Sequence, residues 1–226
     1  TVQAQAYLSK TVPTQKDALT GARDILVEEL SENAALLGRL RAVMQKEAIV
    51  TSRVMSGKED IGAKFSDYFA HSEKWATIPS HRALAILRAT KDEIVTLDIA
   101  PEPEKGLEHI IGIIASEISI RGQTKGDLWL KDIAVWAWKV KLSTTMFMDL
   151  LTDLRRRAHA AAIDVFARNL RNLLLAAPAG PRATLGLDPG IRTGCKIAVV
   201  DETGKLLETS TIYPFQPRND LRGAEE

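Results

Sequence analysis

The stretch T-L-G-L-D-P-G-I-R-T-G-C-K-I-A-V-V-D, residues 184–201, decides the fold at the C-terminal end of this 226-residue chain. Apolar and β-branched residues alternate on both sides of a segment that contains Gly190 and Gly194, which is typical of a β-hairpin. A second turn at 202–205 leads into another alternating run, which ends near Ile212. The sequence therefore predicts three successive antiparallel strands over 184–212.

A lone carboxylate, Asp188, stands at the end of the first predicted strand, directly before Pro189 and Gly190. A metal ion or a phosphate can approach an acid in this place closely, because a glycine turn leaves the backbone open. Asp-Pro-Gly is also an ordinary type I turn, so the residues alone leave both interpretations open. Asp201 lies at the following turn, where an acid favours turn geometry, and we do not count it as a site residue.

The residues before Pro178 are predicted to be mostly helical. Apolar residues at three- and four-residue spacing predict two helices between Gln15 and Met44, the second capped by Ser31 or Asn33, and another around 107–118. No proline interrupts 126–177, which predicts one very long helix or two helices that meet near 142–145. Short strands are expected at 50–55 and 93–99. Large rings at helical spacing usually pack, so Trp129 and Trp136 are expected in the core.

The segment at 185–201 resembles the opening of the YqgF-type ribonuclease H-like domain of the Tex family, the bacterial transcription accessory proteins. Four further blocks resemble the same family in the same order: V-M-S-G-K-E-D-I-G-A-K-F-S-D-Y-F from Val54, I-P-S-H-R-A-L-A-I-L-R-A from Ile78, W-A-W-K-V-K from Trp136 and V-F-A-R-N-L-R-N-L-L-L-A-A-P-A-G from Val165. The resemblance spans nearly the whole chain, which we expect to be an internal fragment of a larger protein.

The expected fold is mainly α. A helical scaffold with a long central helix is expected over residues 1–178, followed over residues 183–226 by the truncated start of a ribonuclease H-like β-meander. The resemblance implies binding of nucleic acid, mainly RNA, together with the transcription machinery, and this chain is expected to act chiefly as scaffold. It also implies that the strongest RNA-binding element, a C-terminal OB-fold, lies outside this chain.

The alternative function is a metal-dependent nuclease or resolvase. In ribonuclease H-like nucleases an acid on the first strand is one ligand of a two-metal site, so the resemblance makes Asp188 the candidate catalytic residue, with Mg²⁺ if such a site were active. The other acids are expected beyond Glu226, so we expect neither enzyme activity nor a cofactor here. Actin- and hexokinase-like ATPases also open with an acid–glycine hairpin, but prefer small hydroxyl residues where this chain has Ile191 and Arg192.

A net charge of +1 argues against nucleic-acid binding by overall charge and permits only a local basic patch. Such a patch would use six arginines on the long helix and just after it: Arg155, Arg156, Arg157, Arg168, Arg171 and Arg182. A solvated helix face with acidic partners is the competing interpretation, and the favoured one. Aromatic side chains that stack bases would be exposed, and the predicted sheet offers none apart from Tyr213.

Composition sets the remaining limits. The only cysteine, Cys195, excludes an internal disulfide and fits the reducing cytoplasm, where we expect the protein to work. The four histidines are scattered without ligand spacing, so no metal site is expected from them. No apolar run is long enough to span a bilayer, so no membrane partner is expected.

Overall fold

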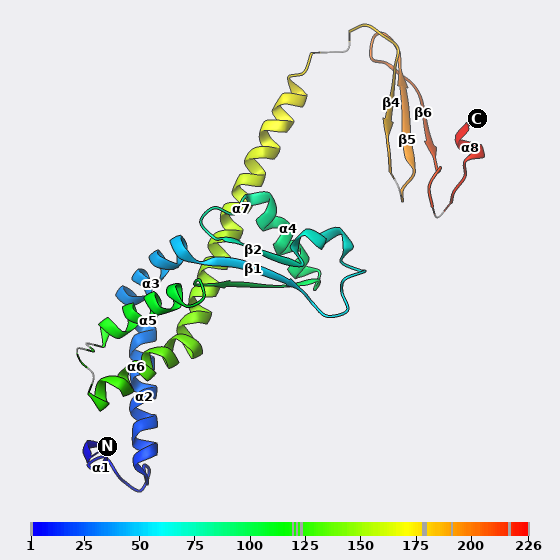
Figure 1. Ribbon diagram of the computed structural model, residues 1–226. Helices are drawn as coiled ribbons and strands as arrows, with labels where there is room; N and C mark the ends of the chain where they lie inside the picture. The colour runs from blue at the N-terminus through cyan, green and yellow to red at the C-terminus, as the bar shows by residue number, and fades with distance from the viewer. Residues whose placement is uncertain are drawn as a thin grey trace. The chain divides into compact units, whose positions relative to one another are not determined.

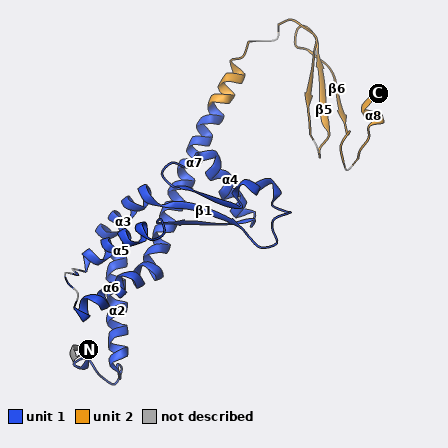
Figure 2. Ribbon diagram, viewed as in Figure 1, with its two compact units in different colours: residues 1–167 blue, residues 168–226 orange. Residues whose placement is uncertain are grey.

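We describe the chain from a computed structural model, in which residues 2–118, 120, 122, 124–177, 180–190, 192–216 and 218–225 are described. Figure 1 shows the helices and strands. The chain divides into two compact units, residues 1–167 and 168–226, which Figure 2 distinguishes by colour. Pro178, at the expected end of the helical region, lies outside the described residues.

Helices form most of unit 1: α1 (Val2–Gln5), α2 (Gln15–Glu32), α3 (Ala34–Glu47), α4 (Ser80–Lys91) and α5 (Lys105–Glu117). A capping box starts α2, in which Thr14 Oγ1 accepts a hydrogen bond from Asp17 N and the Asp17 carboxylate accepts one from Thr14 N. Asn33 caps α3 by accepting a hydrogen bond from Leu36 N, 3.0 Å away. Of the two predicted caps, Ser31 and Asn33, the second begins α3.

The prediction of one long helix, or of two helices that meet near 142–145, within 126–177 is also confirmed. α6 (Lys125–Ala137), the π-helical segment η2 (Trp138–Leu142) and α7 (Ser143–Leu174) follow one another directly. The wider π turn ends at Leu142, where the predicted junction at 142–145 begins. Among the described residues, no helix is both long and apolar enough to cross a membrane.

One row of apolar side chains on α7, at four-residue spacing, supplies a large part of the core of unit 1. Met146, Leu150, Leu154 and Ala158 are each at most 1% exposed. They belong to one cluster with apolar residues of α3 and α5: Leu36, Leu40, Met44, Ile110 and Ile114. Since these residues come from helices far apart in sequence, this cluster ties unit 1 together.

Unit 1 also contains a three-stranded antiparallel sheet in the order β2-β1-β3, made of β1 (Ile49–Val54), β2 (Ala70–Lys74) and β3 (Val95–Ala100). The strands expected at 50–55 and 93–99 correspond to β1 and β3. β2, which follows the 3₁₀ helix η1 (Ala63–Tyr68), was not anticipated. Its sequence, A-H-S-E-K, alternates between exposed and half-buried residues and lacks the large apolar side chains that predict a strand.

Unit 2 contains the predicted meander: β4 (Thr184–Asp188), β5 (Cys195–Val200) and β6 (Leu206–Ile212), all antiparallel in the order β4-β5-β6. A short helix, α8 (Arg222–Glu225), follows. The mainly α fold with a following small antiparallel sheet is therefore confirmed. Among the strand residues of this sheet, Cys195 alone is buried, at 4% exposure.

The expectation that both Trp129 and Trp136 lie in the core is wrong for Trp136, which is 43% exposed. The buried face of α6 is formed instead by Ile133, Ala134 and Ala137. Helical spacing places the two tryptophans on a common face, but it cannot tell which neighbouring element covers that face.

Candidate functional site

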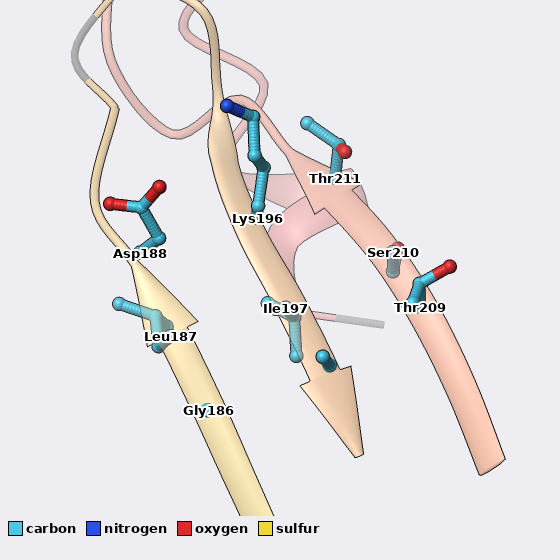
Figure 3. A pocket seen from close by; sticks show the side chains of 9 residues that line it. Gly186, Leu187, Asp188, Lys196, Ile197, Thr209, Ser210 and Thr211 are labelled. Atoms are coloured by element: carbon cyan, nitrogen blue, oxygen red, sulfur yellow. The ribbon is translucent and has the colours of Figure 1, made fainter. Parts of the chain in front are cut away.

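Asp188 is the last residue of β4, and strand pairing places it directly opposite Lys196 of β5. Lys196 lies opposite Thr211 of β6 in turn, so the three side chains form one row on one face of the sheet. Figure 3 shows the Asp188 carboxylate and the Lys196 ammonium at the same end of a hollow of about 650 Å³. The other residues that line it are Gly186, Leu187, Ile197, Ala198, Thr209, Ser210 and Thr211.

The glycine of the β4–β5 turn is required by its surroundings. Gly194 has a φ of +86°, in the region that favours glycine. A Cβ atom there would lie 2.7 Å from Thr211 Cγ2 and from the Tyr213 ring, which is closer than packed atoms tolerate. The turn geometry that sets Asp188 opposite Lys196 therefore depends on glycine at this position.

The residues around Asp188 do not fit a complete metal site. In the part of the chain that the structure describes, no group of three or more His, Cys, Asp or Glu side chains could hold a metal ion. The side chain opposite Asp188 is a lysine, whose positive charge opposes a bound cation. A single carboxylate would leave most of the ligands of Mg²⁺ to water and substrate phosphates. We therefore derive no catalytic step from Asp188, and Ile191, which bears on the ATPase alternative, lies outside the described residues.

Asp201 shapes the β5–β6 turn, in agreement with its interpretation as a turn residue. Its carboxylate accepts hydrogen bonds from Thr203 Oγ1 at 2.7 Å, Thr203 N at 2.8 Å and Lys205 N at 3.0 Å. These bonds favour the charged form of the carboxyl group, and the bond from the Thr203 hydroxyl has the largest effect. They hold the pKa of the Asp201 carboxyl below its usual value.

The three consecutive arginines of α7 have three different environments. Arg157 Nη2 donates to Trp75 O at 2.7 Å, and its guanidinium carbon lies 4.5 Å from the centre of the Trp75 ring. Arg156 pairs with Asp153 at 2.9 Å. Arg155 is exposed and has no ion pair among the described residues. Arg157 thus has a structural role, and Arg155 is the most available of the three for an external anion.

The other three arginines belong to unit 2. Arg168 and Arg171 lie three residues apart near the end of α7, and Arg182 precedes β4. All three are exposed, and Arg171 has no ion pair among the described residues. The six candidate arginines are therefore divided equally between the two units.

Two features of the structure, Lys196 opposite Asp188 and a hollow between α2 and α6, were not predicted from the sequence. Lys196 was not considered, although counting residues through the glycine turn would have set it opposite Asp188. A second hollow of about 520 Å³ lies between α2 and α6, lined by Thr14, Gln15, Lys16, Leu19, Thr20, Arg23 and Trp129. No sequence signal joins these residues, because more than a hundred positions separate Arg23 from Trp129.

The fold is a mainly helical region followed by a small antiparallel sheet, and comparison with known families gives the family to which a chain of this kind belongs. The model for the Tex central region matches residues 1–166, and the model for the YqgF-like domain of Tex proteins matches residues 182–226. The chain belongs to the Tex family.

Curated relatives align with nearly the whole chain. Protein YhgF of Escherichia coli is 46% identical over 92% of this chain and 28% of its own length. Transcriptional accessory protein Tex of Neisseria gonorrhoeae is 43% identical over 96% of this chain and 29% of its own length. S1 RNA-binding domain-containing protein 1 of Homo sapiens is more distant, at 24% identity over 90% of this chain and 21% of its own length. The chain thus spans less than a third of the length of these relatives.

Proposed function

We propose that this protein binds nucleic acid, mainly RNA, as a transcription accessory factor in the cytoplasm, and that this chain is chiefly its helical scaffold. The observation that carries the proposal is the match to the Tex central region over residues 1–166. The transcriptional accessory protein of N. gonorrhoeae supports the role in transcription, and the name of the human relative supports RNA as the ligand. The proposed role is binding rather than hydrolysis, and it requires no cofactor.

On the scaffold, unpaired arginines are the groups best suited to contact phosphates. Arg155 and Arg171 are exposed and have no ion pair among the described residues, so binding a phosphate would break no existing pair. Arg156 and Arg157 already have protein partners, at 2.9 Å and 2.7 Å. Arg155 and Arg171 are therefore proposed to contribute, and the other two to remain structural.

The test is a titration of fluorescent single-stranded RNA and duplex DNA with the chain, at low and moderate salt, with and without Mg²⁺. We expect salt-sensitive binding that is stronger for RNA, with both substrates left intact. The double variant Arg155→Ala/Arg171→Ala should bind more weakly and show a shallower salt dependence, since each lost phosphate contact lowers the slope by about 0.7–0.9. Arg156→Ala is the matched control, and no binding at any salt concentration would overturn the phosphate contacts of Arg155 and Arg171 and leave the chain as scaffold alone.

Asp188→Asn separates binding from the nuclease alternative. The substitution keeps the shape of the side chain and removes its charge, so binding should be unchanged. A Mg²⁺-dependent cleavage that disappears in Asp188→Asn would establish catalysis and contradict the proposed role.

A further inference from the structure

We propose that the surface between α2 and α6 binds single-stranded nucleic acid, with Trp136 stacking on a base, Lys16 and Arg23 contacting phosphates, and Trp129 lining the hollow beside them. This inference rests on the proposed function and gives it a particular site. It differs from the proposed phosphate contacts of Arg155 and Arg171 on α7, because it has aromatic rings beside its cations.

The hollow between α2 and α6 has a lining suited to a polyanion. Its volume of about 520 Å³ lies within the range of roughly 300–1,000 Å³ that small-molecule sites occupy. Two cations, Lys16 and Arg23, belong to the lining, and none of its residues carries a carboxylate. Gln15 and Thr20 add side chains that can both donate and accept hydrogen bonds, whereas the Thr14 hydroxyl is already engaged by Asp17 in the capping box.

Helical geometry brings the cations and the rings together. Lys16, Thr20 and Arg23 follow the four- and three-residue spacing of one helix face on α2. Trp129 and Trp136 are seven residues apart, two turns of α6, which is about 10 Å along its axis. Arg23 links the two parts, because it lines the hollow and its guanidinium carbon lies 4.6 Å from the centre of the Trp136 ring.

Trp136 is the most unusual residue of this surface. It remains 43% exposed although Arg23 lies over its ring, whereas Trp75 and Trp138 are only 7% and 6% exposed. An exposed indole is a stacking platform for any base, since every base has a flat π-face. The criterion that base-stacking aromatics are exposed is thus met here, on a helix, by a residue that sequence analysis had placed in the core.

The charges of this surface predict modest affinity. Lys16 is exposed and has no ion pair among the described residues, so its ammonium is available to a phosphate. Arg23 is only partly available to a phosphate, because its guanidinium also forms an ion pair with Asp24 at 2.8 Å. Two phosphate contacts on a single strand would give a plot of log K against log salt a slope of about −1.4 from this surface.

The experiment is a titration of the 226-residue chain with oligouridine RNA, oligothymidine DNA and a hairpin duplex, followed by tryptophan fluorescence. Both single strands should quench the fluorescence of the exposed Trp136, and the duplex should quench it less, because its bases are already stacked. Trp136→Ala should weaken single-strand binding about tenfold, and Trp136→Phe should restore most of the affinity, because a phenyl ring still stacks.

Lys16→Ala should reduce the salt slope by about 0.7, since it removes one phosphate contact. Its matched control is Lys131→Ala, an exposed lysine about 200° around α6 from Trp129, which should bind as the unchanged chain does. Circular dichroism of each variant confirms that the helices are intact.

The possible outcomes distinguish this site from the function proposed above. RNA binding that is unaffected by Trp136→Ala and Lys16→Ala, but weakened by Arg155→Ala/Arg171→Ala, would overturn this site and leave the proposed function standing. No binding of any nucleic acid by the unchanged chain would overturn this site and the arginine contacts of α7 alike, and would leave the chain as scaffold alone. Binding of duplex as tightly as of single strands would contradict the stacking role of Trp136.

Discussion

The two sheets of this chain have the same architecture and opposite surroundings. Each has three antiparallel strands with a six-residue strand in the middle, Ile49–Val54 in one and Cys195–Val200 in the other. In the first, Val50 and Ser52 of the middle strand are at most 1% exposed. In the second, Cys195 is the only strand residue that is buried. An alternating pattern therefore produces a sheet, whereas burial depends on what packs against it.

One face of the sheet of unit 1 is buried, and helices attach to this sheet region through specific contacts. Trp75, which follows β2, donates its indole N–H to Leu150 O of α7 at 3.1 Å. Arg157 of the same helix donates to Trp75 O at 2.7 Å. In unit 2, by contrast, Leu185, Leu187, Leu206 and Leu207 are all more than half exposed.

Hydrogen exchange should show the largest difference between the two sheets. Amides of β1 are expected to exchange only through opening of the whole of unit 1, because this strand is paired on both edges and Val50 and Ser52 are at most 1% exposed. Amides of β5 should exchange through local opening, about 1,000-fold faster or more, a factor that corresponds to about 4 kcal/mol. Mass spectrometry of exchanged peptides from 49–54 and 195–200 tests this, and equal protection of the two would contradict the comparison.

A matched pair of truncations should sharpen the difference. Ile99 lies opposite Val50 and is 2% exposed, so Ile99→Ala should destabilise unit 1 by about 2–5 kcal/mol. All four tryptophans lie in unit 1, so fluorescence during urea unfolding follows this unit alone. Leu187→Ala is the counterpart in unit 2 and should cost about 0.5 kcal/mol or less, because Leu187 is 55% exposed. Hydrogen exchange of peptides from 184–212 follows unit 2, and a similar cost at both positions would show that the exposed sheet is packed after all.

Arg157→Ala should separate structural from available arginines. The substitution removes the hydrogen bond to Trp75 O and the contact with the Trp75 ring, and should cost unit 1 about 1–3 kcal/mol. Arg155→Ala, two positions away, should leave stability unchanged, since Arg155 has no ion pair among the described residues. Urea unfolding of the two variants tests the contrast, and an equal loss in both would count against the structural role of Arg157.

The sheet of unit 2 could be predicted from sequence because local chemistry fixes it. Gly194 has a positive φ and leaves no room for a Cβ beside Thr211 and Tyr213, so glycine marks this turn, and the alternation on either side sets the strands. In the sheet of unit 1, β2 was missed because its edge position leaves A-H-S-E-K without large apolar residues. Periodicity likewise grouped Trp129 with Trp136 and misplaced Trp136, because its exposure depends on α2, far away in sequence. Pairing within a hairpin is local, whereas packing between helices is not.

The smallest predicted effect concerns pH and the β5–β6 turn. Hydrogen bonds, above all from the Thr203 hydroxyl, lower the pKa of the Asp201 carboxyl in the folded chain. Because its pKa is lowered, the Asp201 carboxylate stabilises the turn at pH values above the pKa of about 3.9 that it has in the unfolded chain. This stabilisation is lost as the pH falls through the pKa of the folded chain. Nuclear magnetic resonance should therefore show the Thr203 and Lys205 amide signals shifting below about pH 4.

Asp201→Asn is the variant that isolates this effect. It keeps a side-chain oxygen that can accept the hydrogen bonds from Thr203 and Lys205 but does not titrate, so the shifts of those two amides with pH should disappear. Shifts at Thr203 that persist unchanged in Asp201→Asn would assign them to another acid, with Glu202 next in the turn, and would remove Asp201 as the cause.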